Sequence, residues 1–261
     1  MIRVGVIGAG GRMGQEVCRA VTEAEGLELV AEIDPAFADV LTLNGVMRAP
    51  SLRSVEDGSL DVLVDFTVAD IDHGYLADAV TRGFHIVVGT TGLRPAELDA
   101  IAVAAEGDGA NALVAPNFAI GAVLMMKFAE QAAKYFDGVE VIELHHDRKV
   151  DAPSGTALKT IDRIAAARQA AGVAEQRDPT TTMALEGARG GRGPAGIAVH
   201  SVRLPGLVAH EEILFGNPGE GLTLRHDSYD RSSFMPGVLL GIRRVGTISG
   251  LTIGLESFLE D

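Results

Sequence analysis

Two adjacent histidines, a lysine and a Pro-Ser-Gly-Thr segment lie within the eighteen residues 140–157. The imidazoles of His145 and His146 titrate near neutrality, which suits proton transfer, and Lys149 adds a cation that can hold a carboxylate or donate a proton. Residues 153–156 open a strong helical pattern, so the first N–H groups of that helix have no partner within it, and Gly155 lets an anion approach them. The segment predicts a site for a carboxylate-bearing substrate.

A predicted strand over residues 139–144 positions the two histidines, because it is apolar and β-branched and a rigid element delivers the side chains at its end into a cleft. Adjacent residues there point to opposite sides, so one histidine can face the reaction while the other holds substrate or loop. The alternative is that the pair is structural and that Ser-Gly-Thr is only a helix N-cap. The spacing of all these groups favours catalysis.

A glycine turn near the start of the chain predicts a dinucleotide site. A short apolar strand over residues 2–7 runs directly into residues 8–14, GAGGRMG, which are followed by a helix. That order of strand, turn and helix is the context that a phosphate-binding turn requires. The next predicted strand, 27–34, ends in Asp34, where a carboxylate can accept hydrogen bonds from the adenosine ribose. The alternative for Asp34 is a plain turn at the end of a strand.

Further strands are predicted over residues 62–66, 85–88 and 112–115, each followed by a loop. Their alternation with helices predicts a doubly wound parallel sheet, and the loops at the carboxyl ends of its strands are expected to line the cofactor crevice. A long helix from residue 120 then leads into the histidine strand and a β-rich region. The expected fold class is α/β, with a Rossmann-like dinucleotide-binding domain over 1–119 and 231–261 and an inserted α+β domain over 120–230.

The 261 residues are 47% hydrophobic and carry a net charge of -14. This composition suits one large or two medium globular domains, and the charge repels nucleic acid and anionic membranes, so neither is an expected partner. The basic run 188–193 is interpreted as a mobile loop rather than an RNA-binding tract. Lys149, Arg189 and Arg203 are the candidate local cations for an anionic substrate.

No apolar run approaches the roughly 20 residues that a membrane-spanning helix needs. A cytoplasmic location is expected. The single cysteine, Cys18, falls in a predicted helix and is expected to be a buried apolar residue in a reducing compartment.

With the glycine turn and the histidine segment in view, the chain resembles the 4-hydroxy-tetrahydrodipicolinate reductase family, formerly called dihydrodipicolinate reductase. The family pattern E-[IV]-x-E-x-H-x3-K-x-D-x-P-S-G-T-A is matched throughout residues 140–157. Four other segments match in order: GAGGRMG at 8–14, VDFT at 64–67, VGTTG at 88–92 and APNFAIG at 115–121. The resemblance covers nearly the full length.

The resemblance implies reduction of a cyclic imine dicarboxylate in the diaminopimelate and lysine pathway with NADH or NADPH, by a homotetramer joined through sheets of the second domain. It implies that His145 donates and accepts a proton, that Lys149 donates a proton, and that His146, Gly155 and Thr156 bind substrate. It implies no metal. The residues that it assigns to the dinucleotide are Gly8, Ala9, Gly10, Gly11, Arg12, Met13, Asp34, Gly89, Thr90, Thr91, Ala115, Pro116, Asn117 and Phe118.

The nucleotide preference stays open, because some family members carry lysines where this turn has Ala9 and Arg12, and no arginine directly follows Asp34. Two other functions also remain. Another Rossmann dehydrogenase of amino or hydroxy acids explains the first 118 residues but gives Lys149 and the Ser-Gly-Thr segment no role. A non-catalytic NAD(H)-binding sensor would bind the dinucleotide and turn nothing over.

Overall fold

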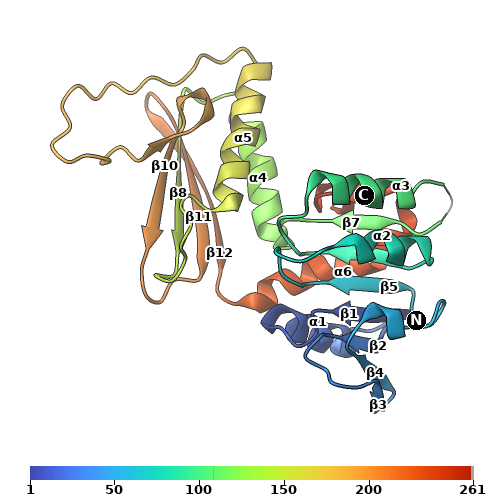
Figure 1. The fold of residues 1–261 in the computed structure, drawn as a ribbon. Helices are drawn as coiled ribbons and strands as arrows, with labels where there is room; N and C mark the ends of the chain where they lie inside the picture. The colour runs from blue at the N-terminus through green and yellow to red at the C-terminus, as the bar shows by residue number, and fades with distance from the viewer. Residues whose placement is uncertain (108, 260–261) are drawn as a thin grey trace. The chain divides into compact units, whose positions relative to one another are not determined.

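The computed structural model describes residues 1–107 and 109–259 of the chain. The chain forms two compact units, one of Met1–Ile120 with Arg231–Asp261 and one of Gly121–Asp230 (Figure 1). The expected domain boundary placed residue 120 in the inserted domain, whereas the structure groups it with the first unit. No helix in the described part of the chain is both long and apolar enough to span a bilayer.

The first unit contains an eight-stranded sheet that is parallel except for one edge hairpin. Its strands, in spatial order, are β13 (Leu251–Ile253), β7 (Ala112–Val114), β6 (His85–Val88), β5 (Val62–Asp65), β1 (Ile2–Ile7), β2 (Leu27–Ile33), β4 (Val46–Ala49) and β3 (Leu41–Leu43). Only β3 and β4 pair in the antiparallel sense. The prediction of a Rossmann-like parallel sheet is confirmed.

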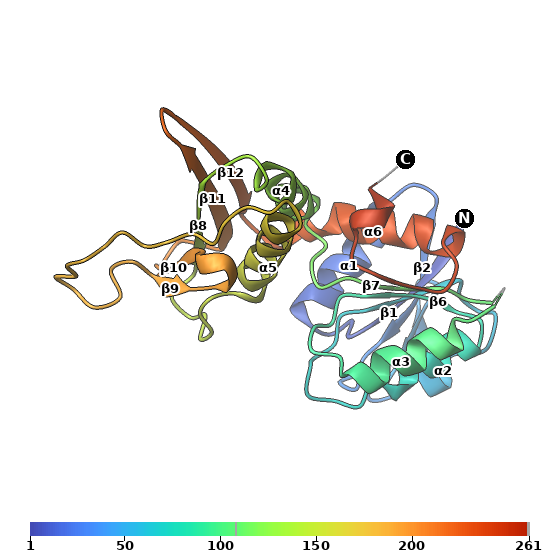
Figure 2. The same cartoon turned by 90° about the horizontal axis from the view of Figure 1, so that it is seen from above.

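Helices cover both faces of this sheet. In Figure 2, α2 (Gly74–Thr81) and α3 (Pro95–Ala104) lie together on one face, and α1 (Arg12–Glu23) and α6 (Met235–Arg244) lie on the other. Buried aliphatic and aromatic side chains of the central strands and of α2 and α3 form one core cluster, which includes Phe84 and Ile86. Both faces are covered, which explains why these parallel strands are continuous apolar runs. Short 3-10 turns lie at Leu52–Ser54, Arg231–Phe234, Val245–Thr247 and Glu256–Phe258.

The order of the strands fixes where a ligand can enter. The chain goes from β1 to β2 on one side and then returns to place β5 on the other side of β1. In open parallel sheets such a reversal leaves a crevice outside the carboxyl ends of the strands, because the two flanking connections leave in opposite directions. The glycine turn after β1 and the loop after β5 therefore border the same crevice.

The second unit is a five-stranded mixed sheet with two helices on one face. The strands, in spatial order, are β12 (Glu220–Ser228), β11 (Ala209–Asn217), β8 (Gly138–His145), β10 (Ala198–Arg203) and β9 (Gly191–Arg192). Figures 1 and 2 show α4 (Ile120–Ala132) and α5 (Gly155–Ala170) side by side along this sheet, and a 3-10 turn lies at Pro194–Gly196. Strands β8 and β10 are parallel, and the other pairs are antiparallel.

Alternation along β8 decides which side chains meet the helices. Val139 and Val141 are buried against residues of α4 and α5, including Ile161. Since the side-chain period of a strand is two, Glu143 and His145 share that helix-facing side. The same alternation places the intervening residues of β8 on the opposite face.

Candidate active site

The turn between β1 and α1 is shaped to admit an anion. Gly8 has φ +83°, and a Cβ there would lie 2.4 Å from the Phe66 carbonyl oxygen, so a side chain is excluded. A Cβ on Gly14 would lie 2.0 Å from the Gly8 carbonyl oxygen. Helix α1 begins after Gly11 with no side-chain cap on its first N–H groups. These amides and the positive end of the helix dipole favour a phosphate.

Asp34 follows β2 and faces the glycine turn. One carboxylate oxygen accepts a 2.9 Å hydrogen bond from the Gly10 N–H, and the other accepts one of 2.9 Å from Ala36. Asp34 therefore does both: it stabilises the turn at the end of β2, and it lies beside the phosphate-binding turn. The carboxylate lies where a ribose would follow a pyrophosphate.

Two pockets open at the carboxyl ends of the strands in this unit. The larger, about 580 Å³, is lined by residues that include Ile7, Ile33, Pro35, Pro50, Arg53, Thr67 and Tyr75. The smaller, about 350 Å³, is lined by Met13, Phe66, Thr67, Ala69, Gly89, Thr90, Thr91, Pro116, Asn117, Phe118 and Phe234. Most of the predicted residues after β6 and β7 therefore line one pocket, while Ala115 is buried. Thr67 lines both pockets.

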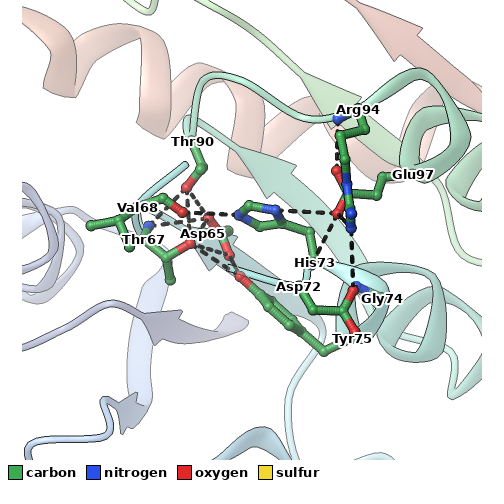
Figure 3. Close-up of polar contacts among 10 residues, drawn as sticks. All are labelled: Asp65, Thr67, Val68, Asp72, His73, Gly74, Tyr75, Thr90, Arg94 and Glu97. Atoms are coloured by element: carbon green, nitrogen blue, oxygen red, sulfur yellow. Dashed lines mark hydrogen bonds and ion pairs between the residues drawn. The ribbon is translucent and has the colours of Figure 1, made fainter. Parts of the chain in front are cut away.

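A fully buried carboxylate, Asp65, holds the loops around these pockets (Figure 3). It accepts hydrogen bonds from the Tyr75 hydroxyl at 2.5 Å, from the Thr67 hydroxyl at 3.1 Å and from the Thr90 hydroxyl. Burial, together with the negative charge of Asp65, raises the pKa of Tyr75. The phenol therefore stays protonated and donates. Sequence reasoning missed this network, although a carboxylate at the end of a buried strand is a signal for it.

A second polar contact joins the loop after β5 to α3. His73, which is buried, places Nε2 3.1 Å from the Val68 carbonyl oxygen, and a carbonyl can only accept, so Nε2 carries a proton. Nδ1 of the same ring lies 3.5 Å from Glu97. Hydrogen bonds from the Arg94 side chain and backbone lower the pKa of Glu97 to about 2. Figure 3 shows the ring between the two segments.

In the second unit, Glu143 is the centre of the predicted catalytic segment. It is fully buried, and its carboxylate accepts hydrogen bonds from His145 Nδ1 at 2.5 Å and from the two terminal nitrogens of Arg203 at 2.9 and 2.7 Å. Burial alone would raise the pKa of Glu143, but the hydrogen bonds from Arg203, Ser201 and His145 outweigh burial and lower it. Glu143 is thus an anion inside the protein.

Burial lowers the pKa of His145, and Glu143 opposes this effect only in part. The imidazole is therefore mainly neutral at pH 7, and a proton that it gains from solvent or substrate is readily released. Such a group suits transient proton transfer better than permanent charge.

Lys149 lies in the turn after β8 and forms an ion pair. Its Nζ is 2.8 Å from each carboxylate oxygen of Asp151, and the lysine lowers the pKa of that carboxyl. The Asp151 carbonyl oxygen also accepts a 2.7 Å hydrogen bond from Arg203. Arg203 therefore connects the lysine turn to Glu143. His146, the residue after His145, has a buried Nδ1 with no hydrogen-bond partner within the described ranges.

The start of α5 offers backbone amides with space in front of them. Ser154 Oγ accepts a 3.2 Å hydrogen bond from the Ala157 N–H, which caps the helix. A Cβ on Gly155 would meet no atom within 4 Å, so the space beside it is open to a ligand. The earlier alternatives, cap or anion site, are compatible because the cap uses only one of the first amides.

The three candidate cations have different positions. Lys149 and Arg203 belong to the hydrogen-bonded set around Glu143, whereas Arg189 pairs with Glu140 on the opposite face of β8. Arg189 is therefore not a cation of this site. The expected mobile loop at 188–193 is also wrong in part, because Gly191–Arg192 pair with β10 as strand β9. Across residues 1–107 and 109–259, no group of three or more His, Cys, Asp or Glu side chains could hold a metal ion.

Comparison with known proteins identifies the same two parts. Residues 2–118 match the family model for the N-terminus of dihydrodipicolinate reductase, and residues 121–259 match the model for its C-terminus. The 4-hydroxy-tetrahydrodipicolinate reductases of Nocardia farcinica and Corynebacterium diphtheriae are 53% and 49% identical over 260 residues, with 99% of each chain covered.

A solved structure gives the same result. The dipicolinate-bound dihydrodipicolinate reductase from Paenisporosarcina sp. TG-14 is 44% identical and superposes with a TM-score of 0.89, over 99% of this chain and 100% of that one. The models cover almost all of the sequence, and the relatives match it from end to end. The chain belongs to the dihydrodipicolinate reductase family.

Proposed function

We propose that this chain reduces 4-hydroxy-tetrahydrodipicolinate to tetrahydrodipicolinate with NADH or NADPH, a step of diaminopimelate and lysine biosynthesis. The observation that carries the proposal is the hydrogen-bonded set formed by His145, Glu143, Arg203, Asp151 and Lys149. Two potential proton donors are held by one connected arrangement, next in sequence to a helix start with an open side. Full-length relatives named for this reaction support the assignment.

The residues of the first unit fit a dinucleotide. The uncapped start of α1 would hold the pyrophosphate, with Gly8, Ala9, Gly10, Gly11, Arg12 and Met13 forming the turn around it. When bound, a reduced nicotinamide supplies the hydride of the reaction. The pocket formed by residues 89–91 and 116–118 would hold the nicotinamide, with Ala115 behind it.

Asp34 bears on the choice of nucleotide. Its carboxylate suits a free 2′-hydroxyl and repels a 2′-phosphate, while the Arg12 cation can offset that repulsion. The proposal is therefore dual use, with NADH used at least as well as NADPH.

The second unit would bind the cyclic dicarboxylate. We assign one carboxylate to the backbone amides of Gly155 and Thr156 and to the unpartnered Nδ1 of His146. The relative from Paenisporosarcina was solved with dipicolinate, a planar dicarboxylate, which supports a substrate of this shape. Lys149 would leave Asp151 to neutralise a carboxylate or to give a proton.

The overall reaction takes up a hydride and a proton and releases water. Loss of the ring hydroxyl gives a conjugated imine, and addition of a hydride creates negative charge on the ring that a proton must quench. His145 would donate that proton from Nε2, because Nδ1 is engaged by Glu143. Burial lowers the pKa of the His145 ring, so the protonated ring gives up its proton easily.

Assembly and location complete the proposal. We propose a homotetramer joined through the second sheet, because Figures 1 and 2 show no helix, within the described residues, on the face away from α4 and α5. That face carries apolar side chains, including Leu214, which is 36% exposed. A cytoplasmic location follows the expectation for an enzyme that consumes reduced nicotinamide nucleotides.

A turnover assay tests the proposal. The product of the preceding pathway enzyme is added to the protein with NADH or NADPH, and the nicotinamide absorbance is followed. The proposed reductase oxidises the nucleotide only when the cyclic imine is present. A sensor would bind NADH without oxidising it, and another dehydrogenase would oxidise it only with a different keto or imino acid.

A further inference from the structure

Strand β8 carries two glutamates on opposite faces, and only one of them touches a proposed catalytic group. Glu143 lies two residues before His145 on the same face, fully buried, with His145 Nδ1 2.5 Å from its Oε2. Glu140 lies on the other face, where it binds Arg189 and His200. Neither glutamate is used by the proposed reaction itself.

The contacts of Glu143 determine the protonation of the histidine ring. Arg203 donates to both carboxylate oxygens, at 2.7 and 2.9 Å, so the group is an ion that can only accept hydrogen bonds. Oε2 accepts from both Arg203 and His145. Nδ1 of His145 must therefore carry the proton, and Nε2 is the nitrogen left to exchange one with substrate.

We infer that Glu143 is a positioning residue that sets the tautomer and orientation of His145 and, through Arg203, the place of the lysine turn. The second part follows because the Arg203 nitrogen that binds Glu143 Oε1 also donates to the Asp151 carbonyl oxygen at 2.7 Å. One buried carboxylate thus supports both proposed proton donors. The inference rests on the proposed function only in treating His145 and Lys149 as proton donors. The tautomer of His145 follows from the contacts alone.

The charged groups around Glu143 support this role. Arg203 faces it from β10, and Glu211 faces it from β11, directly opposite in the register. Burial raises the pKa of Glu211 to about 7, so that carboxyl adds little negative charge in acid. Lys149 and Arg203 both oppose protonation of His145, and Glu143 is the neighbour that favours it.

The decisive variants are Glu143→Gln and Glu143→Asp, with Glu140→Gln as the matched control on the other face of the same strand. Glu143→Gln should lower kcat by about 10²-fold, because an amide can donate to Nδ1 and favour the other tautomer. KM for NADH should stay within about twofold. Glu143→Asp should retain part of the activity, and Glu140→Gln should retain nearly all of it.

The pH profile separates positioning from simple loss of structure. A general acid must be protonated, so the rate falls as pH rises through its pKa. Since Glu143 raises the pKa of His145, its loss should move this alkaline limb to lower pH, whereas Glu140→Gln should leave the limb in place. An unchanged limb in Glu143→Gln would overturn the inference.

A measurement on the unmodified protein needs no variant to fold. In protein labelled with ¹⁵N-histidine, the His145 signals, identified by their loss in His145→Gln, should show a protonated Nδ1 and a bare Nε2 at alkaline pH. The opposite tautomer would overturn the inference even if the protein turns over the cyclic imine. If the tautomer is as inferred but no imine is reduced, the proposed function fails and the positioning contact stands.

Discussion

Glu143 receives hydrogen bonds from three side chains, and they explain why a histidine in this chain is suited to chemistry. The signature pattern at 140–157 indicates His145 and Lys149 as chemical groups, but the pattern does not say what holds them. The contact between Glu143 and His145 is visible in the sequence only as a spacing of two within a strand. The sequence indicates Arg203 only as a candidate cation for the substrate, and its contact with Glu143 is not visible, because Arg203 comes from β10, some sixty residues later.

His145 and Lys149 should act in the chemical step. Replacing either with Ala should lower kcat by roughly 10²-fold or more, the typical scale for a general acid, with little change in NADH affinity. His200→Ala is the control, because His200 lies on the other face of the sheet and binds Glu140. Steady-state kinetics at saturating NADH measure the effect, and a near-native kcat in His145→Ala would contradict the assignment.

The Gly155 position tests the carboxylate site. Gly155→Val should fold, because a Cβ there meets nothing within 4 Å, yet the branched side chain would fill the space before the amides. KM for the cyclic imine and the inhibition constant of dipicolinate should rise together by about 10-fold or more, with nucleotide affinity unchanged.

Gly109→Val, in the first unit, serves as the control for that variant, since a Cβ there also meets nothing within 4 Å. Unchanged inhibition by dipicolinate in Gly155→Val would place the substrate carboxylate elsewhere.

The central strands of the first unit follow closely from the pattern of the sequence, whereas edge strands in both units do not. Strands β1 and β6 have the predicted bounds, because continuous apolar runs between turns identify buried parallel strands. Strand β12 was not predicted. Its residues, EGLTLRHDS, alternate without strong hydrophobicity because it is an edge strand with one face toward solvent. The hairpin of β3 and β4 was missed because short exposed strands depend on their neighbours.

Glu211 on β11 is buried and hydrogen-bonded to Thr160 on α5, and its burial predicts a pH-dependent stability. Burial holds the pKa of Glu211 at about 7, against an ordinary value of 4.5. Between these two values the unfolded chain loses its proton and the folded chain keeps it, so folding loses stability as pH rises and the loss ends above about pH 7. The full effect is roughly 3 kcal/mol for this group.

Glu211→Gln should remove that loss. Thermal unfolding of the variant and the unmodified protein between pH 5 and pH 8 should show the variant gaining relative stability as pH rises. Glu212→Gln, the next residue on the other face, is the control and should show no such gain. A constant difference across this pH range would mean that Glu211 is ionised in the folded protein.

The whole molecule combines two units with different patterns of exposure. Both faces of the first sheet are covered by helices, whereas in the described part of the chain helices cover one face of the second. An uncovered sheet face with apolar side chains commonly marks an interface. The net charge of -14 makes a polyanion an unfavourable partner for that face. A second copy of the chain remains the proposed partner.

The oligomeric state is directly measurable. Native mass spectrometry should give a mass four times 27.2 kDa for the unmodified chain. Leu214→Glu, on the uncovered face, should shift the distribution to smaller species because it buries a charge in the interface. Val103→Glu changes an exposed residue of α3 in the first unit and should leave the mass unchanged. A monomeric unmodified protein would contradict the proposal.

The most direct test of the central claim follows the hydride itself. NADH that carries deuterium at the transferable position is incubated with the protein and 4-hydroxy-tetrahydrodipicolinate, and the product is analysed by mass spectrometry. The account predicts tetrahydrodipicolinate with a single deuterium on the ring for each NADH oxidised, and far less labelled product with His145→Ala over the same initial period. NADH that binds but stays reduced, or deuterium that enters a different acid, would contradict it.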